Sequence, residues 1–159
     1  MTQTELADMP SYSVPGAGTQ MFVTMRIDQQ LFGIHVKHVR DVLRPSKITG
    51  IPLAPPEVAG SLNLRGRIVT VVDVRRRLGL GAQAEGAKTM FVGVEHKNEL
   101  YSLMVDSVGE VLTASESQIE KVPGNLNGAW KEVASGIYKM AGELLVIIDI
   151  QTLLMMKGH

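Results

Sequence analysis

The chain has 159 residues, 45% of them hydrophobic, and no cysteine, which excludes disulfides, thiolate catalysis and cysteine-based zinc sites. Lys and Arg number 16, as do Asp and Glu, and this zero net charge argues against a general nucleic-acid binder, which needs a cationic field. No apolar run approaches the roughly 18 residues of a membrane span, and the polar N-terminus has no secretory signal. We therefore expect a soluble cytoplasmic protein.

The first strands are predicted from hydrophobic alternation. Residues 1–19 are polar and rich in Thr, Pro and Gly, and we expect a disordered tail. Residues 20–28 alternate apolar with polar side chains, which predicts a half-buried strand, and residues 31–36 follow a turn as a second strand. Residues 36–43 carry apolar side chains at helix-like spacing, so they form either a short helical turn or a bent strand.

A hairpin follows a proline-rich loop. The four prolines between residues 45 and 56 mark irregular structure, because proline cannot sit in a central strand. Arg65-Gly66, flanked by apolar stretches, predicts a hairpin turn, since glycine accepts positive φ. The strand over residues 68–72 is almost continuously apolar, which is typical of a strand covered on both faces. Asp73 then fits as the N-cap of a short helix.

The chain contains an internal duplication. A shift of 69 positions, from 21 to 90, aligns residues 21–43 with residues 90–112. A second shift of 76 positions, from 66 to 142, aligns residues 66–78 with residues 142–154. The turn glycine at the start of this block and the aspartate after its strand match in both copies. Two ordered blocks of this kind argue against coincidence among common apolar residues.

The duplication predicts the fold. Each repeat, roughly residues 20–80 and 89–156, has about five short strands and too few residues for a sandwich of its own, so two small antiparallel barrels are expected. We predict a mainly all-β protein with a few short helices. The two halves share an interface core, exchange some terminal elements and act as a single domain over residues 20–157.

Residue types that carry catalysis or bind metals lack the partners that they need. His35 and His38 have H-x-x-H spacing, but the sequence places no further zinc ligand beside them, and strand geometry points the pair apart. No serine lies in a nucleophile motif. The equivalence of Asp73 and Asp149 under the repeat favours helix capping over acid–base chemistry. We therefore predict a non-enzyme with no catalytic residues, no metal and no cofactor.

Arg75-Arg76-Arg77 is the basic cluster of the chain. The simpler interpretation is the solvated face of a short helix, since cations are favoured near a helix C-terminus. Contact with nucleic acid is the alternative, but the cluster lacks the interleaved aromatic side chains that stack on bases.

Arg65 is a candidate partner contact because the repeat supplies a comparison. The equivalent hairpin has Ala141 where the first has Arg65, while Gly66 and Gly142 match. The glycine is therefore explained by turn geometry, and the arginine is not required by the fold. A guanidinium on a tight turn suits bidentate contact with a carboxylate. The alternative is a solvated surface arginine.

At these residues the sequence resembles the CheW family of chemotaxis coupling proteins, over about residues 20–156. The stretches that carry the resemblance are residues 31–42, Pro52, the hairpin Gly60-Ser61-Leu62-Asn63-Leu64-Arg65-Gly66, the strand and helix start over 68–75, residues 105–108 and the strand ending at Asp149. Two departures are His35, where an acidic residue is common, and the heavy basic run at 75–77.

The resemblance implies two SH3-like β-barrel halves in a free-standing adaptor. It implies two partners, the regulatory domain of the histidine kinase CheA and the cytoplasmic tip of methyl-accepting chemoreceptors, and recruitment from the cytoplasm to membrane receptor arrays. The receptor contact falls on Val39, Asp41 and Arg65, beside the groove between the halves. The kinase-binding residues are unknown, because the family's barrel-end contacts do not carry over residue by residue.

Rival functions stay open at this point. The nearest is the same type of adaptor in a non-flagellar pathway, such as pilus-based motility, which the sequence does not separate. A more distant rival is a small-barrel nucleic-acid-binding protein, which would show steep salt dependence on a polyanion column.

Overall fold

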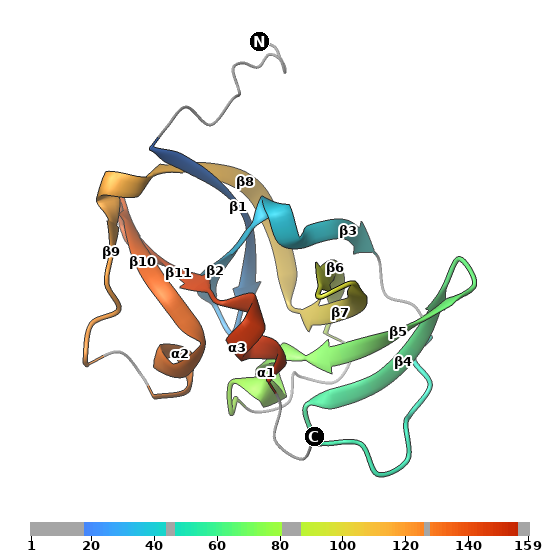
Figure 1. Cartoon of the computed structure of the whole chain (residues 1–159). Helices are drawn as coiled ribbons and strands as arrows, with labels where there is room; N and C mark the ends of the chain where they lie inside the picture. Colours follow the sequence, from blue (N-terminus) through green and yellow to red (C-terminus); the bar gives the residue numbers. More distant parts are fainter. Residues whose placement is uncertain (1–17, 44–46, 81–86, 126–127, 156–159) are drawn as a thin grey trace.

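A computed structural model describes residues 18–43, 47–80, 87–125 and 128–155 (Figure 1). The tail expected at residues 1–19 lies almost wholly outside the described residues. Thr19 is already part of the first strand, so the boundary that we predicted at residue 19 falls one residue late. No helix in the described ranges is long and apolar enough to cross a membrane.

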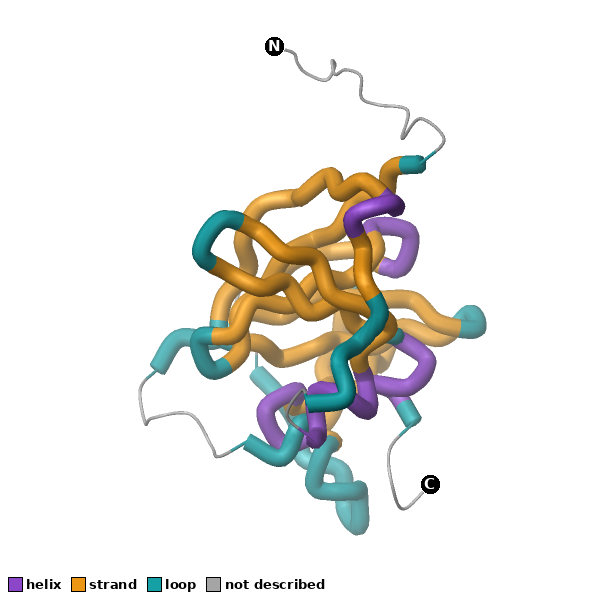
Figure 2. The backbone as a smooth tube through the Cα atoms, turned by 90° about the vertical axis from the view of Figure 1, so that its left-hand side faces the viewer, coloured by secondary structure: helices purple, strands orange, loops and turns teal. Residues whose placement is uncertain are grey.

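Strands dominate the fold, and the helical segments are short. The strands are β1 Thr19–Ile27, β2 Gln30–His35, β3 Val39–Leu43, β4 Val58–Leu64, β5 Arg67–Asp73, β6 Met90–His96, β7 Glu99–Val105, β8 Ser107–Ser115, β9 Ile119–Glu120, β10 Ala134–Met140 and β11 Glu143–Ile148. The helices are α1 Val74–Arg77, α2 Gly128–Val133 and α3 Ile150–Leu154, with 3-10 turns at Val36–His38 and Glu116–Gln118. Residues 36–43 therefore contain both predicted forms, a helical turn followed by a strand. In Figure 2 the helical segments, in purple, lie at the periphery of the strands, in orange.

Each sheet combines strands from both repeats. One sheet has the order β8-β1-β2-β11-β10-β9, and the other has the order β3-β6-β7-β5-β4. Under the repeat alignment, β8-β1-β2-β11-β10 and β3-β6-β7-β5-β4 are the same arrangement. The first sheet forms barrel A (β1, β2, β8–β11) and the second forms barrel B (β3–β7), side by side in Figure 1. The N-terminal hairpin of each repeat thus lies in the barrel built on the rest of the other repeat.

The strand registers match between the barrels. In the parallel pair of barrel A, Phe32 lies opposite Val146, and in that of barrel B their counterparts Tyr101 and Thr70 lie opposite each other. The bulges recur at equivalent places in β4 and β10. The duplication and the two barrel halves are confirmed. Barrel A departs from the predicted five strands only by the short added strand β9.

Three apolar clusters form the core. The largest lies between the barrels and includes Met25, Ile27, Phe32, Val94 and Leu103, all fully buried. Two smaller clusters fill the barrel interiors, one around Phe22 in barrel A and one around its counterpart Phe91 in barrel B. Because the largest cluster draws on both repeats, the barrels pack as one body.

The predicted helix caps are confirmed. The Asp73 carboxylate accepts a hydrogen bond from the Arg76 backbone N–H at the start of α1, at 3.3 Å. The Asp149 carboxylate accepts from the N–H groups of Gln151 and Thr152 at the start of α3, at 3.1 and 3.4 Å. These bonds satisfy donors that the helix itself leaves without acceptors.

The prediction that the strand 68–72 is covered on both faces is wrong at its first residue. Ile68 is 79% exposed, whereas Val69 and Val71 face the interior of barrel B and Val72 faces the inter-barrel core. Ile68 pairs with Asn63 close to the hairpin tip, where the strands project beyond the packed body.

Candidate partner-binding site

The β4–β5 hairpin presents Arg65 at its tip. Arg65 and Gly66 both have positive φ, 53° and 82°, which is the geometry of a two-residue hairpin turn. The Asn63 side-chain oxygen accepts a hydrogen bond from the Gly66 N–H at 3.0 Å and supports the turn. Ala141, the counterpart of Arg65, is not among the described residues with positive φ. Arg65 thus holds a conformation that disfavours side chains and that the matched hairpin avoids.

Asp41 and Arg65 line one cavity. This cavity, of about 210 Å³, opens on barrel B and has an apolar lining that includes Leu62, Val69 and Leu100. Neither Asp41 nor Arg65 makes an ion pair or side-chain hydrogen bond with another described residue. A carboxylate and a guanidinium thus line one cavity, and neither has a hydrogen-bond or ion-pair partner in the described part of the chain.

Val39 lies apart from this pair. Its partner in the register is Val94, a residue of the inter-barrel core, and Val39 packs against that core. Asp41 lies opposite Gly93, which lines the cavity. A bulge between Val39 and Asp41 places an extra residue in β3, so side chains two positions apart point to opposite faces. The structure therefore brings together two of the three predicted receptor-contact residues.

Other cavity residues were missed by the sequence reasoning. Arg40, Arg67, Glu95, Tyr101 and Ser102 also line the cavity. Four of these five differ in kind from their equivalents in the other repeat, so a comparison of the repeats could have found them as it found Arg65. The pairs are Arg40 with Gly109, Arg67 with Glu143, Glu95 with Arg26 and Ser102 with Gly33.

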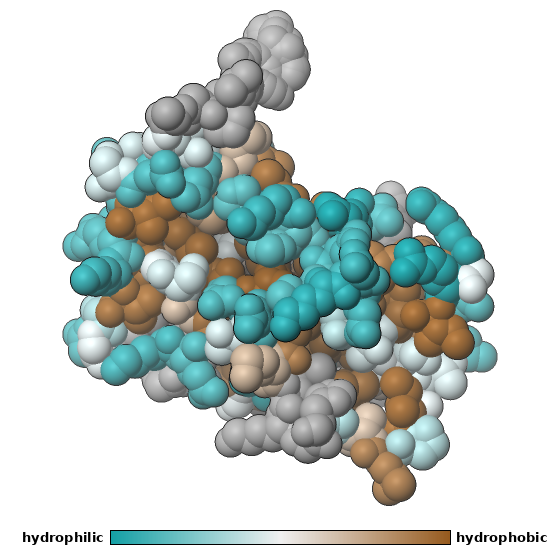
Figure 3. Space-filling view, viewed as in Figure 1, coloured by the Kyte–Doolittle hydropathy of each residue, from teal (hydrophilic) through white to brown (hydrophobic). Residues whose placement is uncertain are grey.

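The surface around the hairpin is mixed. In Figure 3, hydrophilic atoms cover the projecting end of the β4–β5 hairpin, and apolar surface lies beside it and on the loop before β4. The exposed apolar side chains of this region are Val42, Ile51, Leu53 and Ile68. Apolar surface rimmed by charge is typical of a contact surface.

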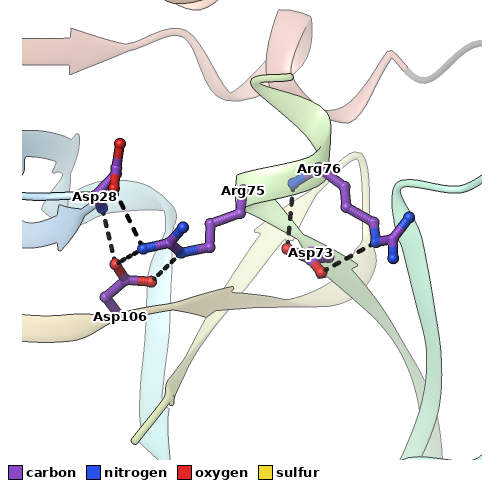
Figure 4. A network of polar contacts seen from close by, with 5 residues as sticks. All are labelled: Asp28, Asp73, Arg75, Arg76 and Asp106. Carbon is purple, nitrogen blue, oxygen red and sulfur yellow. Dashed lines mark hydrogen bonds and ion pairs between the residues drawn. The ribbon is translucent and has the colours of Figure 1, made fainter. Parts of the chain in front are cut away.

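Arg75 is bound inside the molecule. Its guanidinium donates two hydrogen bonds to the Asp106 carboxylate, at 2.9 and 2.8 Å, and lies 3.5 Å from an Asp28 oxygen (Figure 4). The Asp28 backbone N–H also donates to Asp106, at 2.8 Å. The Arg75 and Asp106 side chains are only 16% and 18% exposed. The network ties α1 to the β1–β2 turn and the β7–β8 junction, and so joins the barrels.

The interpretation of residues 75–77 as a solvated face is wrong for two of the three arginines. Arg77 donates to the backbone oxygens of Leu153 and Thr152, both at 2.8 Å, and holds α1 against the end of α3. Arg76 is the exposed member and lies 3.8 Å from Asp73 (Figure 4). The sequence interpretation failed because the partners of Arg75 and Arg77 are distant in the chain.

Charge and burial act on the pKa values of the network. Burial raises the pKa of Asp106, but the hydrogen bonds from Arg75 and from the Asp28 amide outweigh it, and the pKa lies below its ordinary value of 3.8. The hydrogen bond to Asp106 raises the pKa of Arg75 above its ordinary value.

The two histidines do not form a metal site with other described residues. Burial, followed by the charge of Lys37, lowers the pKa of both His35 and His38 below 6.5. His35 accepts a hydrogen bond from the Lys37 N–H at 3.1 Å and packs edge-on against Phe22. Within the ranges that the structure describes, no group of three or more His, Asp or Glu side chains could hold a metal ion.

Comparison with known families decides the class of the protein. The family model described as "CheW-like domain" matches residues 21–157. The chain belongs to this family. It is a chemotaxis adaptor of the CheW type, as the sequence resemblance indicated.

Relatives of the chain agree with this assignment. It is 26% identical to the chemotaxis protein CheW of Rhizobium meliloti, over 85% of this chain and 87% of the relative. It is 29% identical to CheW of Bacillus subtilis, over 86% and 87%. The crystal structure of the scaffolding protein TtCheW from Thermoanaerobacter tengcongensis superposes with a TM-score of 0.79 at 28% identity, covering 88% of this chain and 95% of that one.

Proposed function

We propose that this protein is a cytoplasmic adaptor that couples the cytoplasmic tip of methyl-accepting chemoreceptors to the regulatory domain of the histidine kinase CheA, at membrane receptor arrays. Membership of a family of chemotaxis scaffolds supports the class of function. The observation that carries the receptor contact is the meeting of Asp41 and Arg65 at one cavity, both without partners among the described residues.

The charges of Asp41 and Arg65 suit a protein partner. A guanidinium offers a fork of donors that matches a carboxylate, and a charge-assisted hydrogen bond is stronger than a neutral one. Arg65 adopts a positive φ, which costs a side-chain-bearing residue conformational energy that glycine avoids. Because the equivalent hairpin turn is made with Ala141, the fold does not require arginine here, and we attribute Arg65 to a contact with a partner.

The mechanism requires no chemical step. A rigid body that makes two weak contacts raises the effective concentration of one partner near the other. The inter-barrel core and the Arg75–Asp106 network supply that rigidity, because they join elements of both barrels. A conformational bias in the receptor reaches the kinase only if the two contacts are energetically coupled through this body.

The first test is an Arg65→Ala variant in two binding titrations, one with a receptor cytoplasmic fragment and one with the kinase. Receptor affinity should fall by about ten- to a hundredfold, because a charge-assisted hydrogen bond is worth roughly 1.5–3 kcal/mol. Kinase affinity should be largely spared, and the free energy of unfolding should change by less than about 0.5 kcal/mol.

Gly66→Ala is the matched control. Its φ of 82° strains an alanine, so it should destabilise the hairpin and weaken binding to both partners together. Wild-type receptor affinity in folded Arg65→Ala protein contradicts the assignment. Equal loss toward both partners would show that the hairpin, rather than the arginine, had been perturbed. Co-purification that identifies the bound kinase and receptor separates a flagellar from a pilus-type pathway.

A further inference from the structure

The cavity of barrel B has a counterpart on barrel A. That second cavity, of about 380 Å³, is lined by the repeat equivalents of many of the same positions. The pairs that line both are Thr24 with Gly93, Arg26 with Glu95, Leu31 with Leu100, Gly109 with Arg40, Glu110 with Asp41, Met140 with Leu64, and Glu143 with Arg67. The duplicated fold thus holds two versions of one hollow, and differences between them are not imposed by the fold.

The rim charges differ. On barrel A, Arg26 and Glu143 form an ion pair at 2.7 Å. On barrel B, the position of Glu143 holds Arg67, and Glu95 pairs instead with Arg40 at 2.8 Å. Among the described residues no acidic side chain pairs with Arg65 or Arg67. Barrel A thus pairs the charge at Glu143 internally, whereas Arg65 and Arg67 of barrel B, which have no acidic partner among the described residues, can bind an external anion.

The floors differ as well. Ser102 lines the barrel B cavity, is 1% exposed, and its hydroxyl has no hydrogen-bond partner among the described residues. Its counterpart on barrel A is Gly33, where an added Cβ would meet Leu145 at 3.2 Å. A buried hydroxyl without a hydrogen-bond partner lowers the free energy of unfolding, so Ser102 destabilises the protein while no ligand is bound.

The size of the cavity suits one side chain. A cavity of roughly 150 Å³ is large enough for benzene, so about 210 Å³ accommodates a side chain between leucine and tyrosine in size. The lining by Leu62, Leu64, Val69 and Leu100 favours an apolar body. Such a pocket with a few placed polar groups is typical of an anchor site.

We propose that the barrel B cavity seats one side chain of the receptor segment that has an apolar body and a polar end, that the Ser102 hydroxyl hydrogen-bonds this polar end, and that Arg67 acts beside Arg65 on a neighbouring carboxylate. This rests on the function proposed above. Ser102 and Arg67 are then specificity-determining residues, and the anchor is a residue with an apolar body and a polar end, next to an acidic residue.

The test measures melting temperature and the affinities for a receptor cytoplasmic fragment and for the kinase, using the full chain. Ser102→Ala should keep or raise the melting temperature while receptor affinity falls about three- to tenfold, since one hydrogen bond is lost. Arg67→Glu, which installs the charge found at the equivalent position, should weaken receptor binding at least about tenfold. Kinase affinity should stay unchanged in both variants. Lys121→Glu, a reversal at an exposed site far along the chain, should keep the wild-type receptor affinity.

Three results overturn the inference. The first is wild-type receptor affinity in folded Ser102→Ala and Arg67→Glu proteins while Arg65→Ala still weakens binding, which leaves the proposed function standing. The second is a Ser102→Ala variant that melts earlier and loses both partners equally, which makes Ser102 a structural residue. The third is a wild-type protein that binds neither receptor nor kinase, which removes the proposed function and the inference together.

Discussion

The arginines of barrel B and α1 differ in what their guanidinium groups contact. Arg75 and Arg77 are turned into the molecule and bind a carboxylate and backbone oxygens, respectively. Arg65 and Arg67 stand at a cavity without an acidic partner among the described residues. The first pair contributes to holding the barrels together, and the second pair is available to a partner. Substitutions should therefore affect stability in one group and binding in the other.

Loss of Arg75 should destabilise the protein. Arg75→Ala leaves Asp106 largely buried without its bidentate partner, and we expect the free energy of unfolding to fall by about 2–4 kcal/mol. Arg76→Ala is the matched control on the same helix, and it should cost less than about 0.5 kcal/mol because Arg76 is exposed. Denaturant unfolding of both variants measures the difference. Equal stabilities would show that the Arg75 network does not secure the barrel junction.

The same network predicts a dependence of stability on acidity. The pKa of Asp106 is lower in the folded protein than its ordinary 3.8, so its stabilising contribution is complete above that value and is lost as the pH falls below it. The Asp106→Asn variant has no carboxyl group at this position, so its stability lacks this contribution at every pH. The difference in unfolding free energy between wild type and Asp106→Asn should therefore shrink from about pH 6 to about pH 2.5. A constant difference would contradict the role of the carboxylate charge.

At the scale of elements, one contact of the β4–β5 hairpin depends on a glycine. Gly60 has a φ of 150° at the bulge of β4, and an added Cβ would overlap the Thr49 carbonyl. Thr49 and Ser61 exchange two backbone hydrogen bonds of 2.8 Å there, which fasten the loop before β4 to the strand. The chain can approach this closely only where no side chain intervenes.

Gly60→Ala should lower the free energy of unfolding by about 2–4 kcal/mol, through backbone strain and displacement of the Thr49 segment. Gly66→Ala on the same hairpin should cost only about 1 kcal/mol, because its Cβ would meet open space and only the positive φ is strained. Thermal or denaturant melting of the two variants ranks these effects. A Gly60→Ala protein as stable as Gly66→Ala would mean that the loop before β4 is not held at this point.

For the whole molecule, the exchange of hairpins makes the repeats interdependent. In barrel A the hairpin β1–β2 comes from the first repeat and all other strands come from the second. In barrel B the hairpin β6–β7 comes from the second repeat and all other strands come from the first. Fragments 1–80 and 87–159 should therefore not fold as monomers when expressed alone, and co-expression should restore one cooperative transition. Self-association of a single fragment is compatible with this exchange, since one copy could lend its hairpin to another. A fragment that folds cooperatively as a monomer in sedimentation and melting experiments would contradict it.

Local patterns in the sequence determined much of this protein. Alternation predicted β1 and β2, Arg65-Gly66 predicted the hairpin, and Asp73 and Asp149 were predicted as caps, because each depends on neighbours within a few residues. The duplication and the Arg65–Ala141 difference were equally visible, since comparing one repeat with the other needs no coordinates. The Arg67–Glu143 and Ser102–Gly33 differences were visible in the same way.

Only the tertiary structure decided which hairpin joins which barrel, since pairing within a repeat and pairing between repeats satisfy the same local pattern. It also placed Asp41 beside Arg65, turned Val39 away through a bulge, and joined Arg75 to Asp106 across 31 positions. These contacts depend on how distant segments pack, and neither the periodicity nor the residue types of a segment specify its distant partners.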